Sequence, residues 1–384
     1  MLARINCCVI IPTYNNARTL KRVLEEVWAY SGQDRTIVIN DGATDATAEI
    51  LEEYRGRIIV LENMRNRGKG YSLRRGFREA IERGFDNAIT IDSDGQHFAD
   101  DIPAFVKAAL EQPGSLVMGS RNMDQEGVPG KSAFGNKFSS FWFWFHTGIK
   151  LPDTQTGYRL YPLAPLKTMR LVTEKFETEI EVIVKMAWRG VRFASVPVRV
   201  KYDPDERVSH FRPFRDFSRI SLLNTWFFLL TLAWYLPRRL LKRLLEKGIM
   251  NTIRDELFRS GESEARKAAS VGFGLFMGIV PIWGFQLMVG IPAAIALRLN
   301  KILFFLAANI SIPPMIPVIV YASYKTGEIF FSKPAVKIGS WKEVTLQTIH
   351  LHFVQYAAGA VLLACLAGLA GFLLSYLFLR ITKR

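Results

Sequence analysis

Ala88-Ile-Thr-Ile-Asp-Ser-Asp-Gly-Gln-His97 is a short β-branched run that ends in two carboxylates, an amide and an imidazole. A strand running into a turn projects such side chains together from the end of a sheet, where oxygen ligands can hold a divalent cation against a diphosphate. The alternative is an Asp-rich turn, because Asp and Gly also terminate strands for conformational reasons alone. The flanking sequence has to decide between the two interpretations.

Strand-like and helix-like segments alternate through the first half of the chain. Amphipathic helices are predicted to begin near residues 17, 45, 69 and 101. The apolar runs between them are residues 7–13, 36–40, 58–62, 88–92 and 116–121. This alternation predicts an α/β fold in which helices cover both faces of a predominantly parallel sheet.

Three of the predicted strands end in polar residues. Ligands bind outside the carboxyl ends of the strands in such sheets, so we expect these three sets to meet at one crevice. The alternative is chance placement of polar loop residues. The sets are Thr13-Tyr14-Asn15, Asn40-Asp41-Gly42 and Asp92-Ser93-Asp94.

Composition divides the 384-residue chain into two regions. Hydrophobic residues make up 49% of it and concentrate beyond about residue 219, so residues 1–215 are predicted to be soluble and the remainder to meet a membrane. The net charge of +15 comes largely from Lys and Arg beside apolar runs, as in residues 237–247 and 380–384, which favours lipid over nucleic acid as the partner. The three cysteines provide neither a disulfide framework nor a zinc site, which fits a reducing cytoplasm.

The apolar segments of the second half differ in character. Residues 221–236 either span a membrane or lie along its interface, and residues 238–258 are predicted to form an amphipathic surface helix. Residues 271–297 and 302–321 are interrupted by Gly and Pro, which is typical of kinked spans or paired re-entrant helices. Residues 354–379 are predicted to span the membrane.

An aromatic cluster precedes these segments. Six of the eight residues from 138 to 145 are Phe or Trp. Tryptophan-rich amphipathic segments favour the headgroup level of a membrane, so we favour an interfacial helix over the alternative, a buried core helix.

Six motifs occur in order along the first 215 residues. They are Val9-Ile-Ile-Pro-Thr-Tyr-Asn15, Ile39-Asn-Asp-Gly-Ala-Thr-Asp45, Arg67-Gly-Lys-Gly70, Ile91-Asp-Ser-Asp-Gly-Gln-His97, Gly119-Ser-Arg121 and Asp153-Thr-Gln-Thr-Gly-Tyr-Arg159. Together they resemble the family 2 inverting glycosyltransferases of the GT-A fold, specifically the polyprenyl-phosphate (dolichyl-phosphate) hexosyltransferase branch. The resemblance implies a Rossmann-like nucleotide-sugar domain.

The resemblance also implies a donor site. Pro12, Tyr14 and Asp41 are expected to line the base and ribose, with Asn15 in the same motif. Lys69 and Arg121 are expected to offset diphosphate or acceptor-phosphate charge, and the alternative for both is a solvated surface charge. Asn16 and Asn40 depart from the family's usual acidic residues, which leaves the nucleotide base unnamed.

A metal site follows from the same comparison. Asp94 and Gln96 are expected to ligate Mg²⁺ or Mn²⁺, and Asp92 is shared between the metal and the donor ribose. His97 either ligates the metal or caps the turn, and we prefer the second interpretation.

Catalytic roles are implied for three residues, Asp153, Arg121 and Arg159. Asp153 is expected near the reacting carbon of the sugar, and Arg159 is expected to be oriented by the Gly157 turn. Glu179 is expected either to hold a sugar hydroxyl or to form a surface salt bridge.

A basic segment ahead of the membrane completes the implied site. Arg207, Ser209 and Arg212 are expected to bind the acceptor phosphate, although His210 stands where the family often has lysine.

A second resemblance covers part of the tail. Gly278-Ile-Val-Pro-Ile-Trp-Gly-Phe-Gln286, Leu299-Asn-Lys301 and residues 309–314 look like an uncharacterised membrane domain of the DUF2062 type. The predicted organisation is therefore a transferase domain at 1–215, a juxtamembrane segment at 216–264 and a helical membrane domain at 265–384.

These features predict a membrane-bound, metal-dependent transferase. It would transfer a hexose, with inversion, from a nucleotide-diphosphate sugar to a membrane lipid. The preferred acceptor is polyprenyl phosphate, and the expected location is the cytoplasmic face of the cytoplasmic membrane. One alternative is a glycolipid synthase acting on a lipid hydroxyl, for which Asp153 would have to accept a proton. Another is a carrier or lipid-flipping module with a nucleotide-sugar sensor. The sequence leaves the oligomeric state open.

Overall fold

The computed structural model describes residues 1–32, 34–122, 130–201, 212–282, 285–311, 315–330 and 353–382. The chain forms two compact units, residues 1–227 and residues 228–384.

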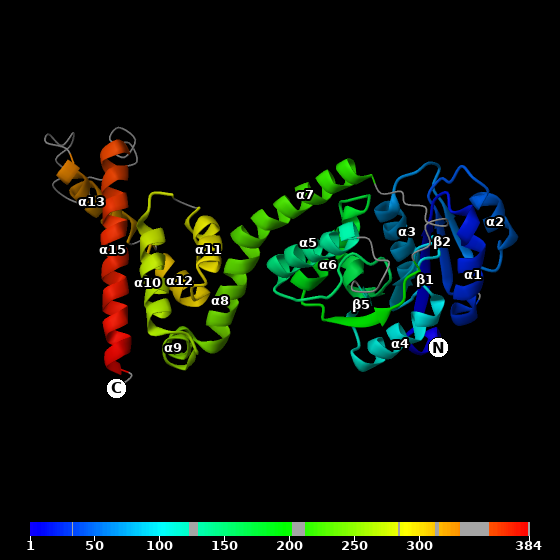
Figure 1. Ribbon diagram of the computed structural model, residues 1–384, viewed down its shortest axis with the longest axis horizontal. Coiled ribbons are helices and arrows are strands. Elements are labelled where there is room, and N and C mark those ends of the chain that lie inside the picture. Colours follow the sequence, from blue (N-terminus) through cyan, green and yellow to red (C-terminus); the bar gives the residue numbers. More distant parts are fainter. Residues whose placement is uncertain are drawn as a thin grey trace. The chain divides into compact units, whose positions relative to one another are not determined.

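The first unit is built on a seven-stranded mixed sheet, with the strand order β3-β2-β1-β4-β6-β5-β7 (Figure 1). The strands are β1 (Cys7–Thr13), β2 (Thr36–Asn40), β3 (Ile59–Glu62), β4 (Asn87–Thr90), β5 (Leu116–Arg121), β6 (Arg159–Pro162) and β7 (Phe193–Val198). The first five strands match the predicted runs, and the α/β class is confirmed. Strand β6 was not predicted, and it runs antiparallel between β4 and β5.

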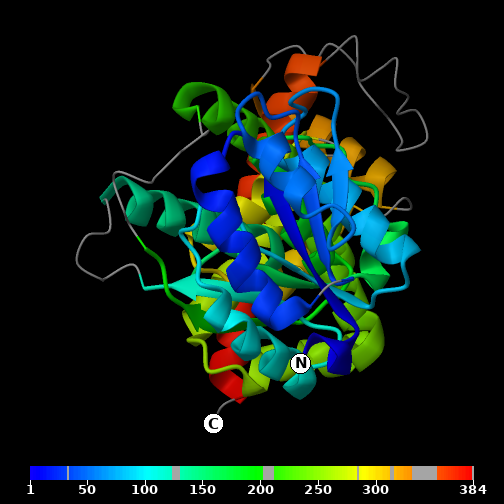
Figure 2. The same cartoon turned by 90° about the vertical axis from the view of Figure 1, so that its right-hand side faces the viewer.

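Helices lie on both faces of this sheet (Figure 2). On β1, Val9 and Ile11 pack in one core with α1 and α4, whereas Ile10 faces Gly76 of α3 on the opposite side. A Cβ atom at Gly76 would lie 2.7 Å from Ile10 Cγ2, so this glycine allows α3 to approach the strand closely. The helices of this unit are α1 (Ala17–Ser31), α2 (Thr47–Glu53), α3 (Lys69–Glu82), α4 (Ile102–Glu111), α5 (Gly130–Thr147), α6 (Glu177–Trp188) and the first part of α7 (Pro213–Leu230).

The aromatic segment predicted at 138–145 lies on α5, which contacts α7 through the rings of Phe138 and Phe217, 5.9 Å apart. Phe143 is buried, while Phe141 and Trp144 are exposed. The segment is therefore partly a core helix and partly an exposed aromatic face.

The second unit is helical. Its long helix α15 packs along α10 and α13 (Figure 1), and α10 and α15 meet at glycines, since a Cβ atom at Gly272 would lie 2.6 Å from the carbonyl oxygen of Gly368. The two interrupted apolar segments form the helix pairs α10–α11 and α12–α13. The helices are α8 (Leu236–Lys247), α9 (Ile249–Arg254), α10 (Glu264–Ile279), α11 (Gln286–Ala296), α12 (Lys301–Ala308), α13 (Ile316–Gly327) and α15 (Phe353–Thr382).

The predicted surface helix over 238–258 is not continuous. It is interrupted at Gly248, whose φ of 76° lies in the left-handed region that ends helices.

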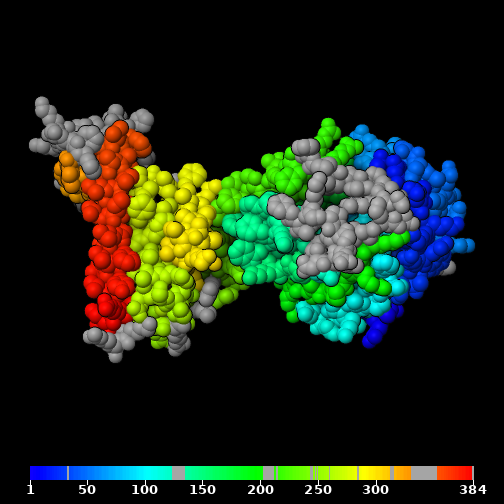
Figure 3. Space-filling view, viewed as in Figure 1, coloured from blue at the N-terminus to red at the C-terminus, as the bar shows by residue number. Residues whose placement is uncertain are grey.

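Two helices among the described residues are long and apolar enough to cross a membrane, Arg215–Lys242 and Phe353–Thr382. The second carries a row of exposed leucines, including Leu366, Leu369 and Leu373, on the helix drawn red in Figure 3. Length and composition alone support this assignment, and they indicate association with a membrane.

Candidate active site

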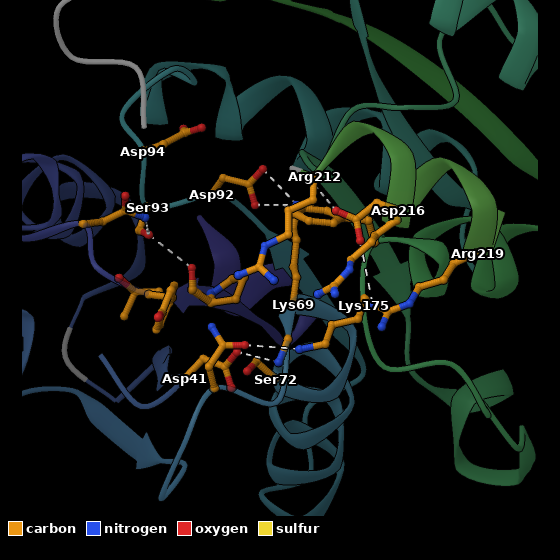
Figure 4. Close-up of a pocket in the computed structure, with 18 of the residues that line it drawn as sticks. Asp41, Lys69, Ser72, Asp92, Ser93, Asp94, Lys175, Arg212, Asp216 and Arg219 are labelled. Atoms are coloured by element: carbon orange, nitrogen blue, oxygen red, sulfur yellow. Dashed lines mark hydrogen bonds and ion pairs between the residues drawn. The ribbon is translucent and has the colours of Figure 1, made fainter. Parts of the chain in front are cut away.

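A cavity of about 770 Å³ lies at the carboxyl ends of β1, β2 and β4 (Figure 4). The three polar strand ends predicted to converge do lie around it. Eight of the predicted site residues line its wall: Pro12, Tyr14, Asp41, Lys69, Asp92, Asp94, Gln96 and Arg212.

Asp41, directly after β2, holds a neighbouring loop in place. Its Oδ1 atom accepts hydrogen bonds from the Arg67 backbone N–H (2.9 Å) and from Asn63 Nδ2 (2.6 Å). Its Oδ2 atom accepts from the Gly68 N–H (2.6 Å). A carboxylate has about four acceptor positions, so Asp41 retains one for a donor group on a ligand.

Gly42 lets the chain turn beside this carboxylate. Its φ is +69°, and a Cβ atom there would lie 2.5 Å from the Arg65 carbonyl carbon. Gly84 has a similar φ of +79° with nothing within 4 Å of a Cβ atom, so it provides a matched control.

We expect Gly42→Ala to lower the stability of the protein by about 3 kcal/mol and Gly84→Ala by about 1 kcal/mol. Both substitutions place a side chain at a positive φ, but only Gly42→Ala adds a backbone collision. Thermal unfolding of the full chain in detergent measures the difference. Equal losses in Tm would show that the contact with Arg65 relaxes at no cost.

Lys69 lies between two carboxylates. Its Nζ atom is 2.7 Å from Asp92 Oδ1, donates to Asp92 Oδ2 at 2.9 Å and lies 3.2 Å from Glu179 Oε1. Burial alone would lower the pKa of Lys69, but the two carboxylates raise it overall. The solvated alternative for Lys69 is wrong, as is the surface salt bridge for Glu179, because both side chains are largely buried.

The same contact sets the charge state of Asp92. Burial would raise the pKa of its carboxyl group, but the charge and hydrogen bond of Lys69 bring the pKa below its usual value. Asp92 is therefore an anion whose two oxygen atoms are both within reach of one ammonium group.

Asp94 and Gln96 lie in the turn that follows β4. The Gln96 backbone N–H donates to Asp94 Oδ1 (3.1 Å), and both residues line the cavity. Carboxylate and amide oxygens are suitable ligands for Mg²⁺ or Mn²⁺, whose remaining ligands are commonly water and substrate phosphate oxygens. No group of three His, Cys, Asp or Glu side chains able to hold a metal occurs among the described residues. The donor set thus fits a cation held jointly by protein and ligand.

His97 does not line the cavity. Its ring lies 5.1 Å from that of Tyr158, and its backbone forms a β-bridge with Val200. Burial lowers the pKa of His97 to about 4, so the ring is neutral at physiological pH. The ring therefore packs beside Tyr158, and the preferred role of His97 as a cap of the turn stays a prediction.

Asn15, which was predicted to bind the donor, forms a hydrogen bond within the protein. Its Oδ1 atom accepts from the Thr44 backbone N–H (2.8 Å), and it does not line the cavity. It therefore ties the end of β1 to the loop that follows β2.

Arg121 and Asp153 are paired with each other outside the cavity wall. Arg121 Nε donates to Asp153 Oδ2 (2.6 Å) and Nη2 donates to Oδ1 (3.1 Å). Burial would raise the pKa of Asp153, but the Arg121 bonds and charge hold it below its usual value. A buried carboxylate in this state is a weak base, which counts against the predicted proton-accepting role.

Arg159 is fully buried and does not contact the cavity. Its guanidinium group donates to the carbonyl oxygens of Thr154, Thr156 and Glu179 and to the hydroxyl of Tyr161. The N–H groups of Arg159 therefore bond to the protein itself, and the side chain stabilises the 153–159 loop. This position does not support the predicted catalytic role.

The acceptor set is only partly described. Arg207 and Ser209 lie outside the described residues, whereas Arg212 lines the cavity. Other residues of the wall were not predicted from the sequence: Lys175, Phe176, Arg215, Asp216 and Arg219. The arginines at 212, 215 and 219 are three and four residues apart, and this helical spacing is the sequence feature from which they could have been predicted.

Two family models match the chain. Residues 8–168 match glycosyl transferase family 2, and residues 249–384 match the family described as an uncharacterised protein conserved in bacteria (DUF2062).

Individual relatives match the first half. A UDP-N-acetylglucosamine–dolichyl-phosphate N-acetylglucosaminyltransferase of Methanococcus voltae is 27% identical, over 50% of this chain and 85% of the relative. An undecaprenyl-phosphate mannosyltransferase of Micrococcus luteus is 26% identical, over 49% of this chain and 81% of the relative. Among solved structures, glucosyl-3-phosphoglycerate synthase from Mycobacterium tuberculosis in complex with uridine diphosphate aligns with a TM-score of 0.45 and 18% identity, over 60% of this chain and 81% of that one.

Proposed function

We propose that this chain, which carries a family 2 glycosyltransferase domain followed by a DUF2062 domain, transfers a hexose from a nucleotide-diphosphate sugar to polyprenyl phosphate. The observation that carries the proposal is a cavity at the ends of β1, β2 and β4 that is also lined by Arg215 and Arg219 of α7. Relatives whose names specify dolichyl or undecaprenyl phosphate support this acceptor class.

The donor would bind at the strand ends. Tyr14 and Pro12 offer apolar surface to the base, and Asp41 has one remaining acceptor position for a base or ribose donor group. Asp92, held by Lys69, faces the ribose and metal side. A divalent cation held by Asp94 and Gln96 would neutralise charge on the departing diphosphate.

The reaction is a displacement with inversion. An oxygen of the acceptor phosphate forms a bond to the anomeric carbon, while the bond from that carbon to the diphosphate oxygen breaks and its electron pair leaves with the nucleoside diphosphate. A phosphate monoester is already anionic at neutral pH, so this step does not need a protein base.

Among the described residues that line the cavity, no side chain is placed as a free base, which weighs against the glycolipid alternative. A lipid hydroxyl would have to lose a proton, and the residue predicted to take it, Asp153, is buried and bonded to Arg121. The carboxylates that line the cavity either form contacts within the protein or are assigned to the donor site, so none of them is proposed as a base. They are Asp41, Asp92, Asp94 and Asp216. A phosphate acceptor, which needs no base, is consistent with this arrangement.

The proposed location is the cytoplasmic face of the cytoplasmic membrane. Two helices suitable for spanning and the basic residues beside them support it, because Lys and Arg concentrate on the cytoplasmic side of membrane helices. The proposed domains are a transferase domain at 1–215, a juxtamembrane segment at 216–264 and a helical membrane domain at 265–384, and the first of these limits falls inside α7.

The decisive experiment identifies the product. Membranes containing the full chain are supplied with radiolabelled nucleotide sugars, Mn²⁺ and either polyprenyl phosphate or polyprenol. We expect label in a lipid that mild acid releases, because a glycosyl phosphate is acid-labile. A labelled lipid that survives mild acid would instead establish transfer to a hydroxyl.

A further inference from the structure

The start of α7, together with the residue just before it, presents charged side chains to the cavity. Arg212, Arg215, Asp216 and Arg219 all line it, at the three- and four-residue spacing that places residues on one helix face. Figure 4 shows Arg212, Asp216 and Arg219 together on one side of the cavity, with Asp94 on the other. This side of the cavity belongs to a helix that is also counted among the candidate spans.

Asp216 organises this helix start. It is only 5% exposed, and its Oδ2 atom accepts from the Arg212 backbone N–H at 2.7 Å. Its Oδ1 atom lies 3.7 Å from Arg219 Nη1. One buried carboxylate therefore fixes the first turn of α7 and holds the guanidinium group one turn further along.

The charge on the two sides of the cavity differs. Near β4, the ammonium group of Lys69 is matched by the carboxylates of Asp92 and Glu179. On the α7 side, the single carboxylate of Asp216 faces three arginines. Lys175 adds a further cation, and its Nζ atom donates a hydrogen bond to the neutral amide oxygen of Asn66 at 3.2 Å. Among the described residues, the α7 side therefore carries an excess of positive charge.

A donor diphosphate does not account for this excess. Its charge would be balanced near Asp94 and Gln96 by the proposed cation, on the other side of the cavity. Guanidinium groups bind phosphate oxygens through two parallel hydrogen bonds, and they have no comparable partner in a lipid hydroxyl. The α7 side thus has the chemistry of a second phosphate site.

We propose that Arg215 and Arg219, with Lys175, bind the phosphate of the lipid acceptor, and that Asp216 is a positioning residue that aims Arg219. This inference rests on the proposed function and names residues for it that the basic segment 207–212 does not include. On this proposal, the start of α7 is the part of the protein that selects polyprenyl phosphate over polyprenol.

The test measures acceptor binding and turnover in the full chain in lipid nanodiscs. We expect Arg215→Gln and Arg219→Gln each to raise the KM for polyprenyl phosphate about 10-fold, with the KM for the donor unchanged. Binding of polyprenyl phosphate without donor should weaken by the same factor, while binding of polyprenol stays as in the wild type. Arg78→Gln, an exposed arginine on α3 outside the cavity, is the matched control.

Asp216 is tested through Arg219. Asp216→Asn should raise the acceptor KM in the wild-type background but have no further effect in Arg219→Gln, because the residue it aims is then absent. A loss that adds fully to that of Arg219→Gln would overturn the positioning role.

Two outcomes would overturn the phosphate site. One is an unchanged acceptor KM in both arginine variants, and the other is a raised donor KM, which would assign these residues to the diphosphate. Failure of the proposed function is distinguishable, because it would appear in the wild type as transfer to polyprenol and not to polyprenyl phosphate.

Discussion

Replacing Asp94 with alanine is expected to lower sugar transfer by about 100-fold or more at saturating donor and acceptor. The side chain lines the cavity in the turn after β4 and is one of the carboxylates that we propose as ligands for a cation there. Loss of a metal ligand removes several kcal/mol of charge stabilisation from the departing diphosphate, and each 1.4 kcal/mol corresponds to about a tenfold change in rate. Radiolabel incorporation into the lipid extract measures the effect.

The control is Asp34→Ala, which removes an exposed carboxylate from the loop after α1. Titration with Mn²⁺ adds a second readout, because Gln96→Ala should need about 10-fold more metal than the wild type for half-maximal transfer while keeping its maximal rate. Equal labelling by Asp94→Ala and the wild type would remove Asp94 from the metal site.

The carboxyl ends of β1, β2 and β4 were predictable from the sequence because each follows a short buried run. Apolar runs and polar strand ends are local signals, and parallel topology brings such ends to one edge of the sheet. The cavity residues Tyr14, Asp41 and Asp94 follow from that logic alone.

Strand β6 was missed because its pairing is not local. Its four residues, Arg159–Pro162, contain an arginine and a proline, and they pair with β4 and β5 from a distant part of the chain. The same insertion buries Arg159 completely, and no local pattern predicts a fully buried arginine. A residue that resembled a catalytic group by motif is therefore a structural one.

The residues of α7 were missed for a different reason. Composition placed a predicted domain limit at residue 215, inside a helix that begins at Pro213. The limit separated Arg212 from Asp216 and Arg219, although their spacing is that of one helix face. Apolar content identified the part of the helix that is a candidate membrane span, but it did not reveal the charged turns before that part.

Lys69→Met is expected to have the second large effect, on stability as well as activity. Methionine keeps the length of the side chain but leaves Asp92 and Glu179 largely buried without their shared cation. Removing one partner of a buried ion pair costs about 3–5 kcal/mol. We expect a lowered Tm of the full chain in detergent, together with loss of most transfer activity. Lys107→Met is the control, because the exposed pair of Lys107 with Glu111 contributes little.

The pH dependence separates this cause from a packing defect. In the wild type, Lys69 holds the pKa of Asp92 low, so the stability from this pair is complete above the ordinary pKa of about 3.9 and is lost as the pH falls through the folded value. In Lys69→Met, the largest contribution that opposes burial is removed, and we expect the folded pKa of Asp92 to rise above the unfolded one. The variant then takes up a proton on folding, so its deficit in Tm should shrink between pH 7.5 and 5.5. Lys69→Met combined with Asp92→Asn should recover stability at pH 7.5 without recovering activity. A deficit that is the same at both pH values would mean that lost packing, and not an unpaired buried carboxylate, destabilises the variant.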